Sequence, residues 1–167
     1  MNRDFQHVRH KPPRVLERPR ELMVALPPMQ SNVNVSRIVR AAGCCGVTHI
    51  IACGHPKIDY KIARDGADEV RIEVHRTLPP VLQRLKTEGY CLVGLEQTTG
   101  SQLIYEYAFP QRCCLVVGHE RHGITDDVLK MLDAVVEIPV YSLPYSHNAA
   151  TATAIALYEF CRQYPDG

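Results

Sequence analysis

The sequence lacks any apolar run that could cross a membrane. A transmembrane helix needs ~20 consecutive apolar residues, and no such stretch occurs among the 167 residues. The N-terminal segment MNRDFQHVRHKPP also contains no apolar core of the kind that signal peptides have. We therefore expect a cytoplasmic protein that does not contact membranes.

A cysteine pattern typical of a metal or redox centre is also missing. The seven cysteines include no C-x-x-C pair, which is the spacing of zinc ribbons and thioredoxin-like motifs. They form the adjacent pairs Cys44-Cys45 and Cys113-Cys114 or stand alone, mostly in apolar runs. A thiol in such a run behaves as a small buried hydrophobe. We expect reduced, structural cysteines and no bound metal.

Excess charge of one sign is absent as well, because the formal net charge is only +1. The charge is unevenly distributed, however. Residues 1–20 contain two acidic residues and six basic ones, namely Arg3, Arg9, Lys11, Arg14, Arg18 and Arg20. We divide the chain into a basic arm, residues 1–19, and a domain, residues 20–167. Such an arm favours an anionic partner, usually nucleic acid, but a merely solvated tail is an equal alternative on charge alone.

Strand and helix patterns alternate from residue 21 onward. Strands are predicted at residues 22–26, 48–54, 69–74, 90–96, 113–118 and 135–140. Helices are predicted at residues 34–45, 60–64, 77–87, 124–133 and 147–164. Several strands are continuous apolar runs, which indicates an α/β fold with a parallel sheet covered on both faces. Ligands bind beyond the carboxyl ends of such strands, so the loops after Glu96, Val117 and Val140 are candidate sites.

The loop Gly118-His119-Glu120-Arg121-His122-Gly123 directly follows one of these strands. Two glycines around a polar turn let the backbone approach a ligand closely. The loop matches neither a phosphate-binding P-loop nor G-x-G-x-x-G. Its histidines have no third metal ligand at suitable spacing, so exposed turn residues are the simpler interpretation. By itself the loop indicates small-molecule binding only weakly.

The first helix, NVSRIVRAAGCCG (34–46), carries two arginines that neighbour each other on its surface. Asn34 is the expected cap. A solvated basic face is the commoner role for Arg37 and Arg40. Arg40 lies among Val39, Ala41 and Ala42, however, and this crowded setting favours a fixed role such as binding a phosphate.

The segment IPVYSLPYSHNAATATAIALYEF (138–160) runs from a strand through a bend rich in hydroxyl groups into a helix. In one interpretation Asn148 or Ser146 caps the helix, and the alanines allow close packing. In the other, the bend encloses a ligand.

Taken together, NVSRIVRAAGCCG (34–46), LVVGHERHGI (115–124) and IPVYSLPYSHNAATATAIALYE (138–159) resemble the three motifs of the TrmH/SpoU class of SPOUT RNA methyltransferases. The resemblance covers roughly residues 21–164. It implies a parallel-sheet α/β fold with a C-terminal trefoil knot, a homodimer, and S-adenosylmethionine as cofactor. The implied reaction is methyl transfer to a ribose 2′-hydroxyl of tRNA or rRNA.

The resemblance also implies roles for individual residues. The cofactor would be held by the backbone around Leu95, Gly118, Ile138, Ser146 and His147. The catalytic site facing the RNA would comprise Asn34, Arg40, Glu120 and Asn148, with Arg40 as the catalytic arginine. Further RNA contacts are expected from Arg37, from the arm residues Arg14 and Arg18, and from Arg20.

Two residues depart from the third motif, which usually reads Ser-Leu-Asn followed two places on by Ser or Thr. Here His147 replaces the leucine, and Ala150 lacks the hydroxyl. These changes keep open an alternative, a non-catalytic RNA-binding or assembly protein that retains the fold. The role of Arg40 is also open between a general base and a stabiliser of the developing alkoxide, because a guanidinium is normally charged and so an awkward base.

Overall fold

The computed structural model describes residues 4–167, and residues 1–3, with Arg3, lie outside the described range. Within it, seven parallel strands form one sheet in the order β3-β2-β1-β6-β4-β7-β5. The strands are β1 (Met23–Leu26), β2 (His49–Cys53), β3 (Arg71–His75), β4 (Cys91–Leu95), β5 (Gln102–Leu103), β6 (Cys113–Val117) and β7 (Ala134–Glu137). The predicted α/β parallel-sheet class is confirmed. The trefoil knot stays a prediction.

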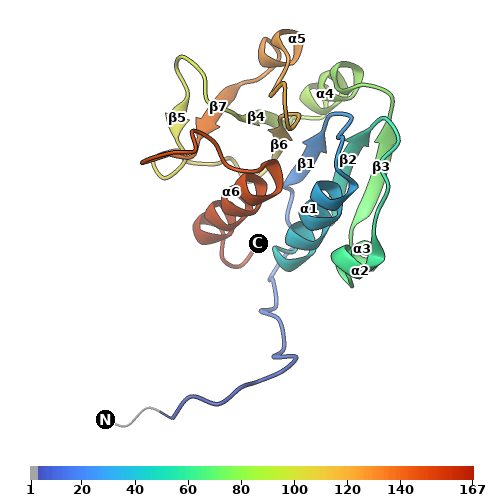
Figure 1. Cartoon of the computed structure of the whole chain (residues 1–167), viewed down its shortest axis with the longest axis vertical. Coiled ribbons are helices and arrows are strands. Elements are labelled where there is room, and N and C mark those ends of the chain that lie inside the picture. Colours follow the sequence, from blue (N-terminus) through green and yellow to red (C-terminus); the bar gives the residue numbers. More distant parts are fainter. Residues whose placement is uncertain (1–3) are drawn as a thin grey trace.

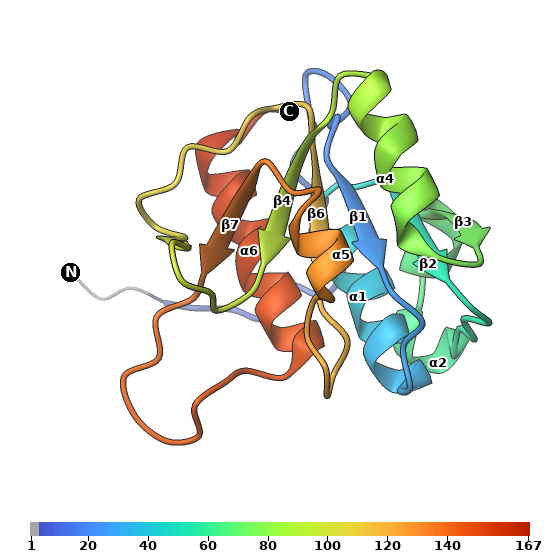
Figure 2. The ribbon, with the colours of Figure 1, turned by 90° about the horizontal axis from the view of Figure 1, so that it is seen from above.

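The helices cover both faces of the sheet (Figures 1 and 2). They are α1 (Asn32–Cys44), α2 (Tyr60–Ala63), α3 (Gly66–Glu69), α4 (Leu78–Thr87), α5 (Asp126–Leu129) and α6 (Ala149–Gln163). Figure 2 shows α1 and α6 behind the sheet and α4 and α5 in front of it. No helix within residues 4–167 is both long and apolar enough to span a bilayer.

Alternation along the central strands gives each face its own core. In β6, Leu115 and Val117 belong to the cluster under α1 and α6, whereas Cys114 and Val116 belong to the cluster under α4 and α5. Successive side chains of a strand point to opposite faces, so a central strand must be apolar at every position. All five residues of β6 are buried, which explains why CCLVV reads as a continuous apolar run.

Helix α1 follows the predicted pattern but begins earlier. Its apolar stripe includes Val35, Ile38, Val39 and Ala42, all buried. The cap is Ser31, whose hydroxyl accepts a hydrogen bond from the Asn34 backbone N–H at 3.2 Å. The expectation that Asn34 is the cap was therefore wrong. Asn34 lies in the first turn, and its side-chain amide is free for other contacts.

The helix predicted at 124–133 was too long. Helix α5 ends at Leu129, because the following residues form a tighter turn. In this turn the Met131 N–H donates to the Val128 carbonyl oxygen, and the Leu132 N–H donates to the Leu129 carbonyl oxygen. Asp133 then pairs with Leu92 of β4, donating its backbone N–H and accepting the Leu92 N–H on its carboxylate. These bonds turn the chain into β7. The short elements α3 and β5 were not predicted, since four residues and two residues give no periodic pattern.

Helix α6 begins with Asn148 as its cap. The Asn148 Oδ1 atom accepts hydrogen bonds from the backbone N–H groups of Ala150 at 2.9 Å and Thr151 at 3.3 Å. Ala156, Leu157 and Phe160 are buried against the rest of the chain. Much of the apolar surface of this helix is thus already covered within one subunit.

Seven free cysteines are present, and four of them (Cys45, Cys53, Cys113 and Cys114) are buried. Burial raises the pKa of the Cys53 thiol to about 11 and that of Cys113 to about 12. These buried thiols therefore stay protonated at neutral pH and contribute as core side chains.

Candidate functional site

The carboxyl ends of β1, β4, β6 and β7 face the same edge of the sheet, and the candidate site lies there (Figure 2). The loop at 118–123 projects between the β1–α1 loop on one side and the β7–α6 loop on the other. The structure brings all five predicted cofactor-binding residues to one cavity of about 250 Å³, which is lined by Leu95, Gly118, Ile138, Ser146 and His147 among others.

Gly118 and Gly123 close the loop into a tight hairpin. The backbone N–H groups of His119 and Gly123 each bond to the carbonyl of the other residue at 2.9 Å. A Cβ on Gly118 would meet the Gly123 backbone at 2.9 Å, and Gly123 has a φ of +64°, which favours glycine. The hairpin needs both glycines, and it presents the side chains between them to the surrounding loops.

Three of the four predicted catalytic residues meet in one hydrogen-bonded cluster. The Asn148 Nδ2 group donates to Asn34 Oδ1 at 3.1 Å, and the Asn34 Nδ2 group donates to Glu120 Oε1 at 3.4 Å. Because Asn148 caps α6, Asn34 lies in α1 and Glu120 follows β6, the cluster ties together the three motif segments. We name these three residues the polar cluster.

Glu120 also accepts hydrogen bonds from the backbone of the β1–α1 loop. The N–H groups of Gln30 and Ser31 donate to its two carboxylate oxygens at 3.2 and 3.0 Å. Partial burial raises the pKa of the carboxyl, but these donors and the Asn34 amide outweigh it and hold the pKa below its ordinary value. Glu120 is therefore a fixed carboxylate at neutral pH.

Arg40 is the fourth predicted catalytic residue, and it lies outside the polar cluster. It is exposed on α1, six residues beyond Asn34, or ~9 Å along the helix axis at 1.5 Å per residue. Arg37 is exposed one turn before it. Both guanidinium groups are thus accessible to an anionic ligand that reaches α1 from solvent.

The three N-terminal arginines that were predicted to bind RNA differ in their surroundings. Arg14 pairs with Asp166 at 2.6 Å, and Arg18 donates to the Gly167 carbonyl oxygen at 3.0 Å. Arg20 is only 9% exposed and donates to the carbonyl oxygens of Cys45 and Tyr164 at 2.7 and 2.6 Å. The prediction of Arg20 as an RNA contact was wrong, because its guanidinium is used inside the fold.

The sequence analysis missed two further carboxylates that line the cavity. Glu96 directly follows β4 and accepts the Ile124 N–H at 3.1 Å, and Glu137 ends β7 and accepts a hydrogen bond from the Ser101 hydroxyl at 2.5 Å. A polar residue at the carboxyl end of a buried parallel strand was the available signal. No group of three or more His, Cys, Asp or Glu side chains between residues 4 and 167 is arranged to hold a metal ion.

The fold and this edge site define an α/β protein with a ligand cavity formed by the loops after β4, β6 and β7. The model of the SpoU rRNA Methylase family matches residues 21–158, so the chain belongs to that family.

Individual relatives agree with this assignment. The tRNA (guanosine(18)-2′-O)-methyltransferase of Escherichia coli (strain K12) is 28% identical over 146 residues, covering 86% of this chain and 64% of that protein. The one of Mus musculus is 39% identical over 82 residues, covering 49% of this chain but only 5% of the mouse protein. The crystal structure of an A. aeolicus TrmH/SpoU tRNA modifying enzyme has a TM-score of 0.84 at 27% identity, covering 90% of this chain and 78% of that one. The chain thus spans less than two thirds of the E. coli and mouse proteins.

Proposed function

We propose that the protein transfers a methyl group from S-adenosylmethionine to a ribose 2′-hydroxyl of tRNA or rRNA. The observation that carries this proposal is the junction of the three motif segments. The polar cluster links α1, the loop after β6 and the start of α6, and Glu120 of this cluster also lines the cavity. A reacting group held by the cluster would therefore lie beside whatever the cavity binds. The E. coli relative, by its name, methylates a tRNA guanosine at the ribose 2′-oxygen.

The chemistry of the cavity suits this cofactor. Three carboxylates line it, those of Glu96, Glu120 and Glu137, against one guanidinium, that of Arg121. S-adenosylmethionine carries a cationic sulfonium and an ammonium group, which carboxylates stabilise. Apolar residues such as Leu95 and Ile138, which are each 8% exposed, supply walls for the adenine. The cofactor supplies the activated methyl group when bound.

The residues of this chain then align and stabilise the acceptor. The amides of Asn34 and Asn148 and the fixed Glu120 carboxylate would orient the ribose, and Arg40 would bind the adjacent phosphate through its planar fork of donors. A guanidinium keeps its charge at neutral pH, so we assign Arg40 the stabilisation of the developing alkoxide rather than removal of the proton.

The non-catalytic alternative rests on His147 and Ala150. These two departures from the motif leave the polar cluster intact, because Asn148 still caps α6 and still donates to Asn34. Ala150 is buried, so the hydroxyl that the motif usually provides there is replaced by core packing. These observations favour the enzyme.

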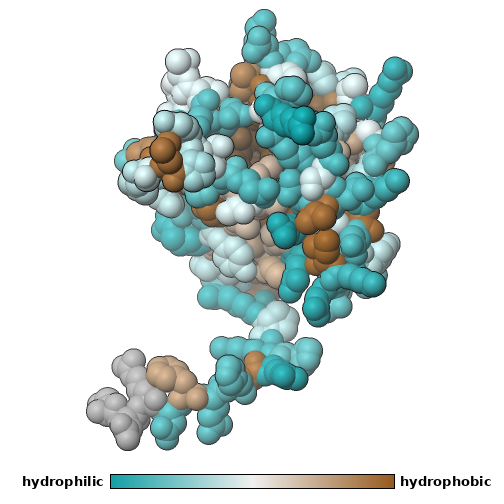
Figure 3. Space-filling view, viewed as in Figure 1, coloured by the Kyte–Doolittle hydropathy of each residue, from teal (hydrophilic) through white to brown (hydrophobic). Residues whose placement is uncertain are grey.

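We also propose a homodimer, with the face of α1 and α6 as its interface. Hydrophobic surface colours appear between the positions of these two helices (Figure 3). Tyr158 of α6 and Val33 of α1 are exposed apolar residues, at 58% and 42%. Covering such residues with a second subunit would remove apolar surface from water.

Substitution of Arg40 tests the proposed function. Arg40→Ala should lower kcat by about 10²–10³-fold, the usual effect of removing one preorganised donor. Its affinity for S-adenosylmethionine, measured by calorimetry, should stay unchanged. Arg40→Lys should restore little activity, because an ammonium lacks the planar fork. The control Arg37→Ala should mainly raise the KM for RNA. A fully active Arg40→Ala protein would contradict the mechanism.

A further inference from the structure

A second cavity of about 280 Å³ lies on the other side of the loop at 118–123. Its walls come from the β1–α1 loop, the start of α4, the loop after β6, and α5. They include Pro28, Leu78, His122, Ile124, Thr125 and Val128. Val117, His119 and Gly123 line both this cavity and the first one, so a single loop separates the two.

This cavity occupies the position in the sheet where α/β proteins usually bind ligands. β1 and β6 are neighbours, and the chain leaves β1 toward α1 on one face but leaves β6 toward α5 on the other face (Figure 2). Connections that leave two adjacent parallel strands in opposite directions open a crevice at their carboxyl ends. Proline residues 27–28 after β1 and the residues after β6 form the two sides of this crevice.

The lining of the second cavity differs from that of the first. No carboxylate lines it, whereas Glu96, Glu120 and Glu137 line the cavity assigned to the cofactor. The rings of His119 and His122 lie nearly parallel, with centroids 4.9 Å apart at 19°, and both belong to its wall. Exposed polar groups, the Thr125 hydroxyl and the His122 imidazole, are also part of the wall. Apolar walls, a stacked ring pair and a few polar groups are features of sites for planar heterocycles.

We propose that this cavity binds the nucleobase of the RNA nucleotide that is methylated. The proposal rests on the proposed function and adds a subsite to it. The Glu120 side chain reaches the β1–α1 loop at Gln30 and Ser31, while Pro27 and Pro28 of the same loop line the second cavity. A ribose held at the polar cluster would thus have the cofactor cavity on one side of the loop at 118–123 and a pocket for its base on the other.

Binding here takes the base out of its stack, as happens in enzymes that do chemistry on a base. The His119–His122 pair replaces part of the stacking that the base gives up, and the apolar walls exclude water from its faces. Selectivity among bases then depends on the polar groups of the rim, since apolar walls contact every base alike. Single-stranded or loop nucleotides are the preferred targets because they are already unstacked.

The first test fills the cavity from its buried wall. Val128 is 4% exposed on α5, and Val128→Phe extends a ring toward the space, whereas Leu129→Phe on the same helix is the matched control because Leu129 does not line it. Val128→Phe should lower kcat/KM for RNA by about tenfold to hundredfold, the range for losing one stacked base, with unchanged S-adenosylmethionine affinity. His122→Ala, at an exposed position, should act in the same direction without affecting folding. Wild-type kcat/KM in both variants would overturn the proposal. So would an equal loss of cofactor affinity, which would assign the cavity to the cofactor.

The second test does not depend on methyl transfer. Guanosine, adenosine and uridine 5′-monophosphates are titrated into wild-type protein saturated with S-adenosylhomocysteine, and the methyl NMR signals of Leu78, Ile124 and Val128 are followed. We expect shifts at these methyl groups, and their loss in His122→Ala. If no methylated RNA is found but the shifts occur, the proposed reaction fails while the base site stands. Absence of shifts with every nucleotide would overturn the site.

Discussion

Glu120→Gln should destabilise the protein because the Glu120 carboxylate holds three segments together. It accepts N–H groups from Gln30 at 3.2 Å, Ser31 at 3.0 Å and the Asn34 side chain at 3.4 Å, and its side chain is only 15% exposed. A glutamine retains one acceptor oxygen and turns an NH₂ group toward at least one of these donors. A hydrogen bond to a charged group contributes about 1.5–3 kcal/mol, and an unsatisfied buried donor costs a similar amount. We therefore expect a loss of about 1.5–3 kcal/mol in the free energy of unfolding.

Urea unfolding at pH 7, followed by circular dichroism, measures this loss. For a chain of this size the expected change corresponds to a melting temperature lower by about 3–12 °C. Glu106→Gln is the control, because Glu106 is exposed and its substitution should change the stability by less than about 0.5 kcal/mol. If Glu120→Gln is as stable as Glu106→Gln, the carboxylate does not join the loops as described.

The pH dependence gives a second, independent check. The folded-state pKa of Glu120 is lowered by its donors, whereas in the unfolded chain it returns to about 4.3. The unfolded state therefore binds the proton more readily, and the stabilisation is fully present above about pH 4.3 and lost as the pH falls through the folded-state pKa. The difference in stability between wild type and Glu120→Gln should be largest near neutral pH and should narrow below about pH 4. A difference that is constant down to pH 3 would contradict the role of its charge.

Three further predictions concern other parts of the molecule. Gly118→Val should abolish S-adenosylmethionine binding in calorimetry, because a Cβ there meets the Gly123 backbone at 2.9 Å; normal affinity would refute the tight hairpin. Arg64 has a φ of 51° and a ψ of −142°, a backbone conformation that costs a non-glycine residue about 1–3 kcal/mol. Arg64→Gly should therefore raise the free energy of unfolding by about 1 kcal/mol. A variant less stable than wild type would show that the substitution relieves no strain. Deletion of residues 1–13 keeps Arg14 and Arg18, which are bound to the C-terminal residues. It should leave the affinity for the cofactor unchanged and reduce the salt dependence of RNA binding. If the salt dependence of RNA binding does not change, the arm is a solvated tail.

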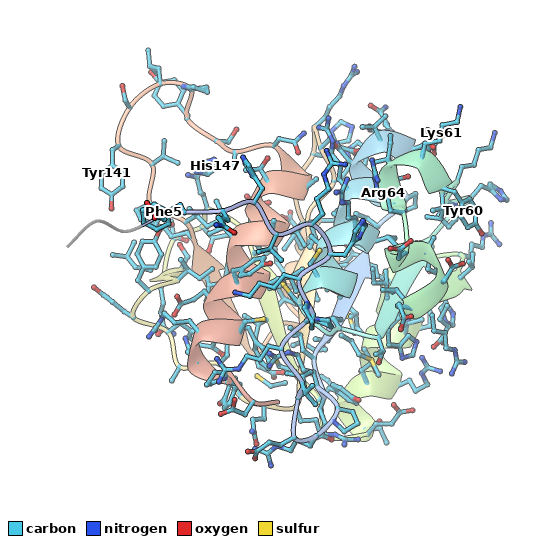
Figure 4. All side chains as sticks on the ribbon, turned by 90° about the horizontal axis from the view of Figure 1, so that it is seen from below. Phe5, Tyr60, Lys61, Arg64, Tyr141 and His147 are labelled. Atoms are coloured by element: carbon cyan, nitrogen blue, oxygen red, sulfur yellow. The ribbon has the colours of Figure 1, made fainter. Side chains whose placement is uncertain are left out.

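Arg64 also illustrates how the surface near α1 is organised. Its side chain projects beside those of Lys61 and Tyr60 of α2, on the side of the molecule away from Tyr141 and His147 (Figure 4). Helix α2 is held against α1 by the Asp59 N–H, which donates to the Ser36 hydroxyl at 2.8 Å. The two arginines of α1 therefore lie on a helix that neighbours Lys61 of α2 and Arg64, the residue directly after α2.

The fold could be predicted from the sequence because the pattern of buried residues is local. Continuous apolar runs such as CCLVV predicted the central strands. The spacing of Leu78, Val81, Leu82 and Leu85 is typical of a helix with one buried face, and all four are buried in α4. The length of α5 could not be predicted in this way. After α5 the chain is turned into β7 by Asp133, whose partner Leu92 is 41 residues distant in the sequence.

The candidate site, like the fold, could be predicted from the sequence only in part. The carboxyl ends of the predicted strands and the two glycines marked the loops around the cavity. The pairing of Asn148 with Asn34, 114 residues apart in sequence, depends instead on how α1 and α6 pack. The burial of Arg20 has the same origin, because its acceptors Cys45 and Tyr164 come from the ends of α1 and α6. Charge and sequence position alone made it resemble the exposed arginines of the arm.

The first interpretation of the bend before α6 is confirmed, whereas the enclosure of a ligand by the bend stays a prediction. Asn148 caps the helix with its oxygen, and Ser146 and His147 line the cavity. The side-chain oxygen of Asn148 thus caps α6, and its NH₂ group donates to Asn34 in the polar cluster. Substitution by aspartate, which caps equally well, would keep the first role and remove the second.

The chemical position of the transferred methyl group is the sharpest test of ribose 2′-O-methylation by this protein. The protein is incubated with S-adenosylmethionine labelled in the methyl group and with separate pools of tRNA and rRNA, and the RNA is digested to nucleosides and analysed by mass spectrometry. We predict label on the ribose as a 2′-O-methylnucleoside, with transfer by Arg40→Ala reduced about 10²–10³-fold. Label on a base, or no transfer by a wild-type protein that binds the cofactor and RNA, would contradict it.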